Sequence, residues 1–234
     1  MLRICIIILI YFVMDFYKTI VQLNFFLYSK KNIYGFYINM DIQKIQMTGF
    51  GADFVSSGKV KKLNKRTGTY EDTPVSFVRI NPFNQNDFEA MTEVCKQWQH
   101  SVYTEQILED VVSIKYYAAP SVTISVYALT AQNKDFNNLK SEDILGFVDV
   151  RNEDDYIYLD FLETKPEYKS SNKKNKEYRN IGTEIINNLK KLTDETCNKI
   201  KIWAVSDKIP YYEKNGFVHD GSKYKNSMIW RKND

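Results

Sequence analysis

Residues 210–217 read Pro-Tyr-Tyr-Glu-Lys-Asn-Gly-Phe, and upstream of them residues 178–183 read Tyr-Arg-Asn-Ile-Gly-Thr. The first stretch predicts a short helix over residues 211–215 that stops at Gly216, because glycine readily takes the left-handed conformation at a helix end. The second stretch predicts a loop that leads into a helix, with Gly182 near the first turn.

Between these two stretches the sequence predicts one helix and one strand. Apolar residues first recur at three- and four-residue spacing, which indicates an amphipathic helix. They are Ile181, Ile185, Ile186, Leu189 and Leu192. Alternating apolar residues over 200–205 then indicate a strand.

The pattern upstream predicts a series of further elements. Residues 40–58 are interpreted as a loosely ordered lead-in, and residues 59–69 as a hairpin arm with its turn. A strand over 75–80 precedes a helix over 88–99, capped by Asn86 or Asp87, and a second helix capped by Thr104. The remaining predicted strands cover residues 122–130, 144–150, 156–164, the region near 217, and 227–230.

The order from the glycine junction to Gly216 and Phe217 resembles the C-terminal half of the GNAT superfamily of acyl-CoA N-acyltransferases. The full order of predicted elements is similar to the mixed-sheet order of the same superfamily. The resemblance covers residues 75–232 and is to the superfamily rather than to an individual member. It implies an α/β fold with a mixed central sheet flanked by helices, here with an N-terminal extension. We expect an apolar leader over 1–39, an extension with a hairpin over 40–74, and the GNAT-like domain over 75–234.

The superfamily's coenzyme motif, Gln/Arg-x-x-Gly-x-Gly/Ala, aligns with residues 177–182. Gly182 keeps the last glycine, whereas Asn180 replaces the first glycine and Glu177 replaces Gln/Arg. Asparagine tolerates a left-handed backbone, and exposed N–H groups at a helix start receive a pyrophosphate well. Glu177 places a negative charge near those phosphates unless it turns away. The resemblance implies coenzyme binding by Arg179, Asn180, Ile181, Gly182 and Thr183.

The loop over 165–180 carries six basic and two acidic side chains. Such a loop suits a coenzyme with several phosphate groups, although a solvated insertion is an equally open interpretation. Residues 162–166 match the end of the superfamily's fourth strand. There the resemblance implies that Leu162, Glu163 and Thr164 bind the pantetheine arm along an unpaired strand edge, with an N–H near Leu162 polarising the thioester carbonyl.

Tyr212 is the candidate proton donor. It matches the tyrosine that commonly protonates the departing thiolate in the superfamily, and a phenol with a pKa of about 10 suits a thiol with a pKa of about 8.5. A packing role is the alternative for Tyr212, and it is the role that we assign to Tyr211.

Asp160 is the candidate base. Period-two alternation on the strand over 156–164 places it on the same face as Tyr158 and Leu162, and opposite Glu163. A solvated or structural carboxylate is the open alternative, so the base is not identified.

Composition and charge limit the classes of partner and site that the chain could have. The 234 residues carry a net charge of +3, but residues 1–39 account for all of it with four basic side chains and one acidic. The basic pI therefore does not argue for a nucleic-acid partner. Three scattered cysteines predict no disulfide framework, and two histidines predict no metal site. These features favour a cytoplasmic protein.

The apolar run over residues 4–14 follows Arg3 and is too short to span a bilayer, which takes about 20 residues. Three interpretations stay open: a weak membrane anchor, an uncleaved signal, or leader sequence ahead of a start at Met40, which we favour. We expect a membrane contact only if residues 1–28 anchor the chain.

The leading functional hypothesis is an N-acetyltransferase that moves an acetyl group from acetyl-CoA to a primary amine by direct attack in a ternary complex. The amine belongs to a small molecule, a peptide or a protein. The alternative is a non-catalytic acyl-CoA-binding or interaction domain with the same fold, which Glu177, Asn180 and the missing base favour.

Overall fold

A computed structural model describes residues 51–98, 101–117, 124–169, 176–193 and 197–232. The predicted leader over 1–39 lies outside the described residues. Residues Gly49–Asp234 form one compact unit. No helix in the described ranges is both long and apolar enough to cross a membrane.

The centre of the unit is a nine-stranded mixed sheet in the order β6-β1-β2-β3-β4-β5-β7-β9-β8. All neighbours pair antiparallel except β5 and β7, which are parallel. The strands are β1 (Asp53–Leu63), β2 (Tyr70–Arg79), β3 (Ile124–Thr130), β4 (Ile144–Asn152), β5 (Ile157–Thr164), β6 (Tyr178–Arg179), β7 (Lys199–Trp203), β8 (Val218–His219) and β9 (Ser227–Arg231). This confirms the predicted fold class.

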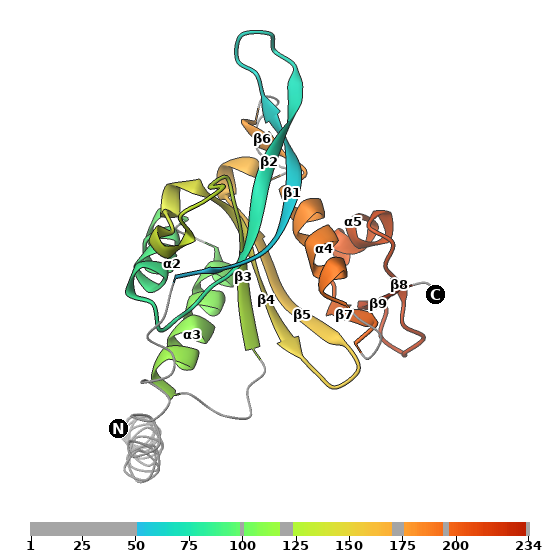
Figure 1. Ribbon diagram of the computed structural model, residues 1–234. Helices are drawn as coiled ribbons and strands as arrows, with labels where there is room; N and C mark the ends of the chain where they lie inside the picture. The colour runs from blue at the N-terminus through green and yellow to red at the C-terminus, as the bar shows by residue number, and fades with distance from the viewer. Residues whose placement is uncertain (1–50, 99–100, 118–123, 170–175, 194–196, 233–234) are drawn as a thin grey trace, which may run out of the picture. The chain divides into compact units, whose positions relative to one another are not determined.

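Helices cover both faces of the sheet (Figure 1). They are α2 (Gln85–Gln97) and α3 (Val102–Tyr117) on one face, α4 (Ile181–Leu192) on the other, and α5 (Ile209–Lys214) beside α4 and β7. Each face has its own apolar core, because successive strand residues point to opposite faces. Phe147 and Val126 lie in the α2/α3 core, whereas Val148 and Val150 lie in the α4 core.

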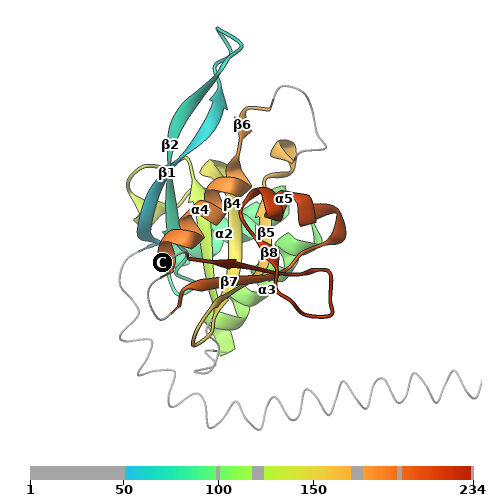
Figure 2. The same ribbon diagram turned by 90° about the vertical axis from the view of Figure 1, so that its right-hand side faces the viewer.

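The N-terminal hairpin is longer than predicted. Strand β1 begins at Asp53, so the loosely ordered lead-in was wrong for the residues from 53 to 58. Its partner β2 runs through the predicted strand over 75–80, and the turn between them closes at Gly68 with a φ of 72°. Figures 1 and 2 show the closed end of this hairpin extending past the rest of the sheet, with β6 alongside.

Two predicted helix caps were also wrong. The cap of α2 is Asn84, whose side chain accepts a hydrogen bond from the Asp87 N–H, so the helix starts earlier than predicted. Thr104 lies inside α3, and the carbonyl of Ser101 accepts hydrogen bonds from the next turn instead. At the other end of the chain Gly216 has a φ of 81°, which confirms the predicted stop of α5.

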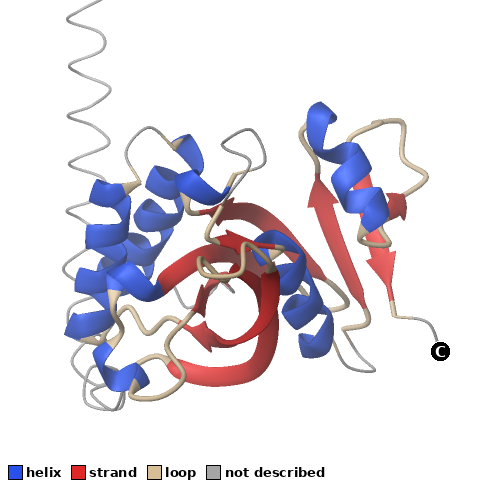
Figure 3. Cartoon of the chain, turned by 90° about the horizontal axis from the view of Figure 1, so that it is seen from above, coloured by secondary structure: helices blue, strands red, loops and turns tan. Residues whose placement is uncertain are grey.

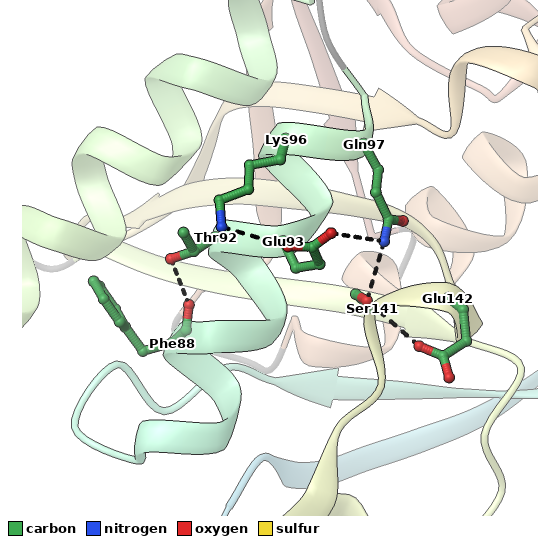
Figure 4. A network of polar contacts seen from close by, with 7 residues as sticks. All are labelled: Phe88, Thr92, Glu93, Lys96, Gln97, Ser141 and Glu142. Carbon is green, nitrogen blue, oxygen red and sulfur yellow. Dashed lines mark hydrogen bonds and ion pairs between the residues drawn. The ribbon is translucent and has the colours of Figure 1, made fainter.

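The outer face of α2 carries a polar network that ties it to the 3₁₀ turn Ser141–Asp143 (Figure 4). Glu93 pairs with Lys96 at 3.5 Å and accepts from Gln97, which also donates to Ser141. A surface cavity of about 280 Å³ lies beside this network, lined by residues of α2 and of the segment 138–142. It lies on the α2 face and does not include α4 or α5.

A bulge at Asp160 divides β5 into two halves. The β4/β5 ladder pairs Asp149 with Phe161 and then Val150 with Leu159, so Asp160 is the extra residue. The parallel pairing with β7 covers only Ile157–Leu159 against Ile200–Ile202. Beyond the bulge, β5 and β7 therefore diverge, as Figure 3 shows for the strands seen from above.

Candidate functional site

The predicted glycine junction starts α4. Asn180 takes the left-handed conformation with a φ of 65°, which glycine adopts most easily and asparagine tolerates. The first helical hydrogen bond runs from the Glu184 N–H to the Asn180 carbonyl, at 2.9 Å. The N–H groups of Ile181, Gly182 and Thr183 therefore point out of the helix start without intrahelical partners.

Gly182 lies where α4, α5 and β5 meet. A Cβ at this position would come within 2.6 Å of the Tyr211 hydroxyl oxygen and 3.6 Å of the Leu162 Cδ2. Only glycine leaves room for so close an approach. The structure thus brings together the predicted coenzyme residues Gly182 and Leu162 with Tyr211 of α5.

The aromatic residue at this meeting point is Tyr211, to which we assigned only packing. Its hydroxyl is buried beside Thr183 and makes no well-aligned hydrogen bond. Burial raises the pKa of Tyr211 to about 12, with a smaller opposing effect from Thr183. Tyr211 therefore stays a neutral phenol, and its hydroxyl lies against the start of α4.

Tyr212 points into the sheet-facing side of α5. Its ring packs edge-on against Phe217 with centroids 5.6 Å apart, and against Tyr211 at 5.1 Å. Burial raises the pKa of Tyr212 well above its usual range, and the neighbouring Tyr211 and Tyr103 add to that rise. Among the described residues, no hydrogen bond to the Tyr212 hydroxyl is found.

Glu177 turns away from the helix start. Its carboxylate pairs with Lys62 of β1 at 3.5 Å, and its carbonyl accepts from the Leu63 N–H. Arg179 pairs in register with Lys61, and its guanidinium stacks 3.8 Å above the ring of Tyr70. The N-terminal hairpin therefore holds the loop that precedes the glycine junction.

The basic loop is partly bound to its own surroundings. Lys165 pairs with Glu167 at 3.1 Å, and Lys176 donates to the carbonyls of Tyr168 and Lys169. Lys173 and Lys174 lie outside the described residues.

The three predicted residues of β5 have different environments. Leu162 packs into the α4 core near Gly182, and Thr164 ends the strand. Glu163 is buried on the α2/α3 side, where it accepts from Ser101 at 2.6 Å and pairs with Lys169 at 2.7 Å. Both carboxylate oxygens of Glu163 therefore already have partners. The edge of residues 160–164 that faces β7 has no strand partner in the described chain, which leaves it open for backbone bonding.

Asp160 lies in the bulge and forms a bidentate ion pair with Arg151, at 2.6 and 2.8 Å. Arg151 also stacks 4.7 Å from the ring of Tyr158. The predicted face assignment was wrong beyond this point, because the extra residue shifts the alternation. Leu162 lies in the α4 core, opposite to Asp160, and Glu163 shares the α2/α3 side with it.

Two further residues lie in environments that the sequence did not predict: Tyr211, to which we assigned a packing role, and Asp149. Asp149 is 1% exposed in the middle of β4, and its Oδ1 has no hydrogen-bond partner. A signal for it was present, because a single charged residue interrupts the apolar run Ile-Leu-Gly-Phe-Val-Asp-Val over 144–150. No cluster of three potential metal ligands occurs in the ranges that the structure describes.

Neither a protein-family model nor a curated protein sequence matches the chain. Among solved structures, it is similar to the PaiA N-acetyltransferase of Thermoplasma acidophilum in complex with coenzyme A, with 15% identity over 68% of this chain and 99% of that one and a TM-score of 0.43. It is also similar to Tetrahymena GCN5, with 13% identity over 63% and 89% of the two chains and a TM-score of 0.43. A spermidine N-acetyltransferase SpeG chimera from Vibrio cholerae and hSSAT gives 10% identity, 67% and 95% coverage, and a TM-score of 0.44.

Several of the solved structures to which this chain is similar are acetyltransferases. At these identities and TM-scores the likeness concerns the fold.

Proposed function

We propose that this protein is an acyl-CoA-dependent N-acyltransferase that transfers an acetyl group from acetyl-CoA to a primary amine. One observation carries the proposal. The unpartnered N–H groups at the start of α4, Leu162 at the open edge of β5 and the Tyr211 hydroxyl of α5 meet at Gly182, and Tyr212 packs against Tyr211. The N–H groups suit the phosphates of acetyl-CoA, and the edge of β5 suits its pantetheine arm.

The coenzyme would be held by backbone rather than by side chains. The N–H groups of Ile181, Gly182 and Thr183 suit its pyrophosphate, because the helix dipole adds partial positive charge at this end. Residues 160–164 of β5 offer an unpaired edge to the pantetheine amides, in the manner of an added strand. The Glu177 carboxylate is paired with Lys62 instead of pointing toward the phosphates.

Tyr212 is the proposed proton donor. The amine nitrogen bonds to the thioester carbon, the C–S bond breaks, and the thiolate takes the phenolic proton of Tyr212. Burial keeps the Tyr212 phenol protonated at neutral pH, so a proton is present when the thiolate forms, while the raised pKa makes its transfer less favourable than from an ordinary phenol. Tyr211 is less suited to this step, because its hydroxyl is enclosed by Gly182 and Thr183.

A non-catalytic acyl-CoA-binding domain is the second candidate. Its supporting observation is that Asp160, the base predicted from the sequence, is neutralised by the bidentate contact with Arg151. Both carboxylate oxygens of Asp160 are occupied by the guanidinium of Arg151.

Two measurements test these proposals in order. Calorimetry with coenzyme A and acetyl-CoA should give saturable heat with one site per chain. Release of free thiol from acetyl-CoA should then depend on the added amine. No binding would refute both candidates, whereas binding without amine-dependent thiol release would leave the binding domain and refute the transferase.

A further inference from the structure

One face of the sheet formed by β7, β9 and β8 lies outside both apolar cores. Alternate residues of these strands, such as Ile202 and Met228, pack into the α4 core, so the residues between them point to the other face. On that side the α2/α3 core takes residues from β2, β3 and β4 and Phe161 of β5 but, within the described chain, none from β7, β8 or β9. Figure 1 shows α2 and α3 on one side of the molecule and these three strands on the other.

Exposed apolar side chains gather on this face. Trp203 of β7 is 51% exposed, and the ring of Tyr224, 50% exposed, lies 5.2 Å from it between centroids. Val218 of β8 is 56% exposed and pairs with Ile229 of β9, which in turn pairs with Lys201. Cross-strand partners share a face, and Lys201 and Trp203 are two residues apart on one strand. We call Trp203, Val218 and Tyr224 the outer patch.

The outer patch has the composition of a binding surface. Elsewhere in the described chain, exposed large apolar side chains occur one to an element, as Phe54, Tyr103 and Tyr116. Tryptophan and tyrosine carry much of the binding energy at protein interfaces, because they offer large rigid surfaces and lose little conformational entropy. A contiguous exposed apolar group of this kind is typical of an interaction site.

Basic side chains surround the outer patch. Residues 199–232 carry eight basic and three acidic side chains. Lys223 and Lys225 flank Tyr224 and are exposed, and the Lys223 Nζ lies 5.1 Å from the centroid of that ring. Lys201 adds a third amine on the face of the patch.

The acidic side chains nearby do not neutralise these amines. Asp207 pairs with Lys208, and Asp220 accepts hydrogen bonds from two serines, one in its own loop and one at the start of β9. Across the described ranges no ion pair joins Lys223 or Lys225 to a carboxylate. The outer patch therefore combines exposed apolar area with uncompensated positive charge.

This charge discriminates between possible occupants. A second copy of the chain, related by two-fold symmetry, would bring the same lysines opposite one another, which is unfavourable. A nucleic acid would satisfy the lysines and stack on the two aromatic rings, but Val218 offers no surface for stacking. A polypeptide that carries both carboxylates and large apolar side chains matches the whole of the patch.

We propose that the outer patch is a docking surface for an acidic polypeptide segment. An aromatic or aliphatic side chain of that segment packs against Trp203 and Tyr224, and its carboxylates lie beside Lys223 and Lys225. This inference is independent of the proposed transferase function, because none of these residues belongs to the site around Gly182.

The test uses the full chain and a displayed library of random twelve-residue peptides as the probe. Selection on the wild-type protein, with Trp203→Ala as the counter-selection target, should enrich peptides that combine several Asp or Glu residues with a large apolar residue. A fluorescein-labelled peptide from the selection is then titrated by fluorescence anisotropy. Its counterpart with Asn and Gln in place of the acids, and a twelve-nucleotide oligothymidine, are titrated alongside.

Two changes in the outer patch should weaken the selected peptide. Trp203→Ala should reduce its affinity about tenfold or more, as for a central tryptophan of an interface. Lys223→Glu combined with Lys225→Glu should also reduce it, by a factor that shrinks as salt increases. Thermal unfolding checks that each variant is folded. If Trp203→Ala does not fold, the lysine double variant serves as the counter-selection target and decides the outcome.

Each change has a matched control. Phe54→Ala removes an equally exposed aromatic ring from β1. Lys134→Glu combined with Lys140→Glu makes the same change in net charge in the loop between β3 and β4. Both controls should bind the peptide within about twofold of wild type, since surface substitutions remote from a contact have small effects.

Three results would overturn the proposal. The first is a selection that yields no peptide dependent on Trp203, or yields peptides without acidic residues. The second is tighter binding of oligothymidine than of the selected peptides, which would make the outer patch a nucleic-acid surface. The third is a concentration-dependent wild-type dimer that Trp203→Ala dissociates, which would give the patch to a second copy of the chain.

Discussion

The hydroxyl of Tyr211 occupies the space that a side chain at Gly182 would need. A Cβ there would lie 2.6 Å from that oxygen but an ordinary 3.5 Å from the adjacent ring carbon. A single oxygen atom therefore sets the requirement for glycine at the start of α4. This relationship connects α4 and α5, which come from the two stretches that define the resemblance.

Gly182→Ala should destabilise the protein by about 1–3 kcal/mol, because the added methyl group overpacks a buried contact. In a Tyr211→Phe background the same substitution should be neutral or stabilising, since alanine is otherwise favoured over glycine in a helix by about 1 kcal/mol. Urea denaturation of the four proteins gives the coupling energy. Additive effects would show that the hydroxyl does not determine the glycine.

Tyr212→Phe should reduce kcat for acetyl transfer about 10- to 100-fold or more and leave coenzyme A affinity unchanged, because only the proton donor is lost. Tyr211→Phe is the matched control on the preceding residue. It should keep activity and be as stable as wild type or more so, since its buried hydroxyl has no well-aligned partner. Steady-state kinetics and calorimetry measure both. The reverse pattern would assign the proton donor to Tyr211.

Stability should fall as the pH rises from 6.5 to 8.5. The folded protein keeps a proton on Asp149, whose pKa is raised to about 9, whereas the unfolded chain releases it above a pKa of about 3.9. The folded state therefore binds more protons, and the free energy of unfolding decreases by on the order of 1 kcal/mol per pH unit.

Asp149→Asn should remove this slope and be more stable than wild type at pH 8. Asp87, raised to about 6 by burial, acts in the same direction only at lower pH, so the chosen window separates the two. Asp154→Asn, in an exposed turn, serves as the control. Urea midpoints across the window give the result, and equal slopes in wild type and Asp149→Asn would contradict the burial of a neutral carboxyl.

Lys62→Ala should weaken coenzyme A binding about two- to fivefold, because it frees the Glu177 carboxylate near the proposed phosphate site. Adding Glu177→Gln in the same chain should restore the affinity. Stability should change by less than about 1 kcal/mol, since both side chains are substantially exposed. Calorimetry at low and high salt measures the effect, which should shrink as salt increases. Unchanged binding in Lys62→Ala would show that the pairing with Lys62 is not what keeps the Glu177 carboxylate away from the phosphates.

Local patterns in the sequence predicted most of the elements between β2 and β9. The apolar spacing in α4 and the alternation in β4 and β5 depend only on neighbours in the chain. These elements can therefore be predicted without a structure. Strand β1 was missed over 53–58 because its polar residues pair with β2 and contact α4, for example through Ser56 and Asn188. Nothing local to those residues indicates such partners.

The candidate site was predictable only in part, for a related reason. The sequence indicated Gly182, Leu162 and the tyrosine pair, but the orientation of Tyr211 toward Gly182 depends on the angle between α4 and α5. The bulge at Asp160 changed which side chains share a face, and bulges arise from the register between strands. The pairing of Glu177 with Lys62 joins segments far apart in the chain.

The sequence by itself determined the α/β class, the order of the elements and the glycine that starts α4, because helix and strand periodicity and backbone permissiveness are local properties. Tertiary structure alone decided that Tyr211 faces Gly182, that Asp160 is held by Arg151, and that Asp149 is buried between Val126 and Phe161. Those contacts depend on distances between residues remote in the chain, and the protonation of a carboxyl group follows from the surroundings that folding places around it.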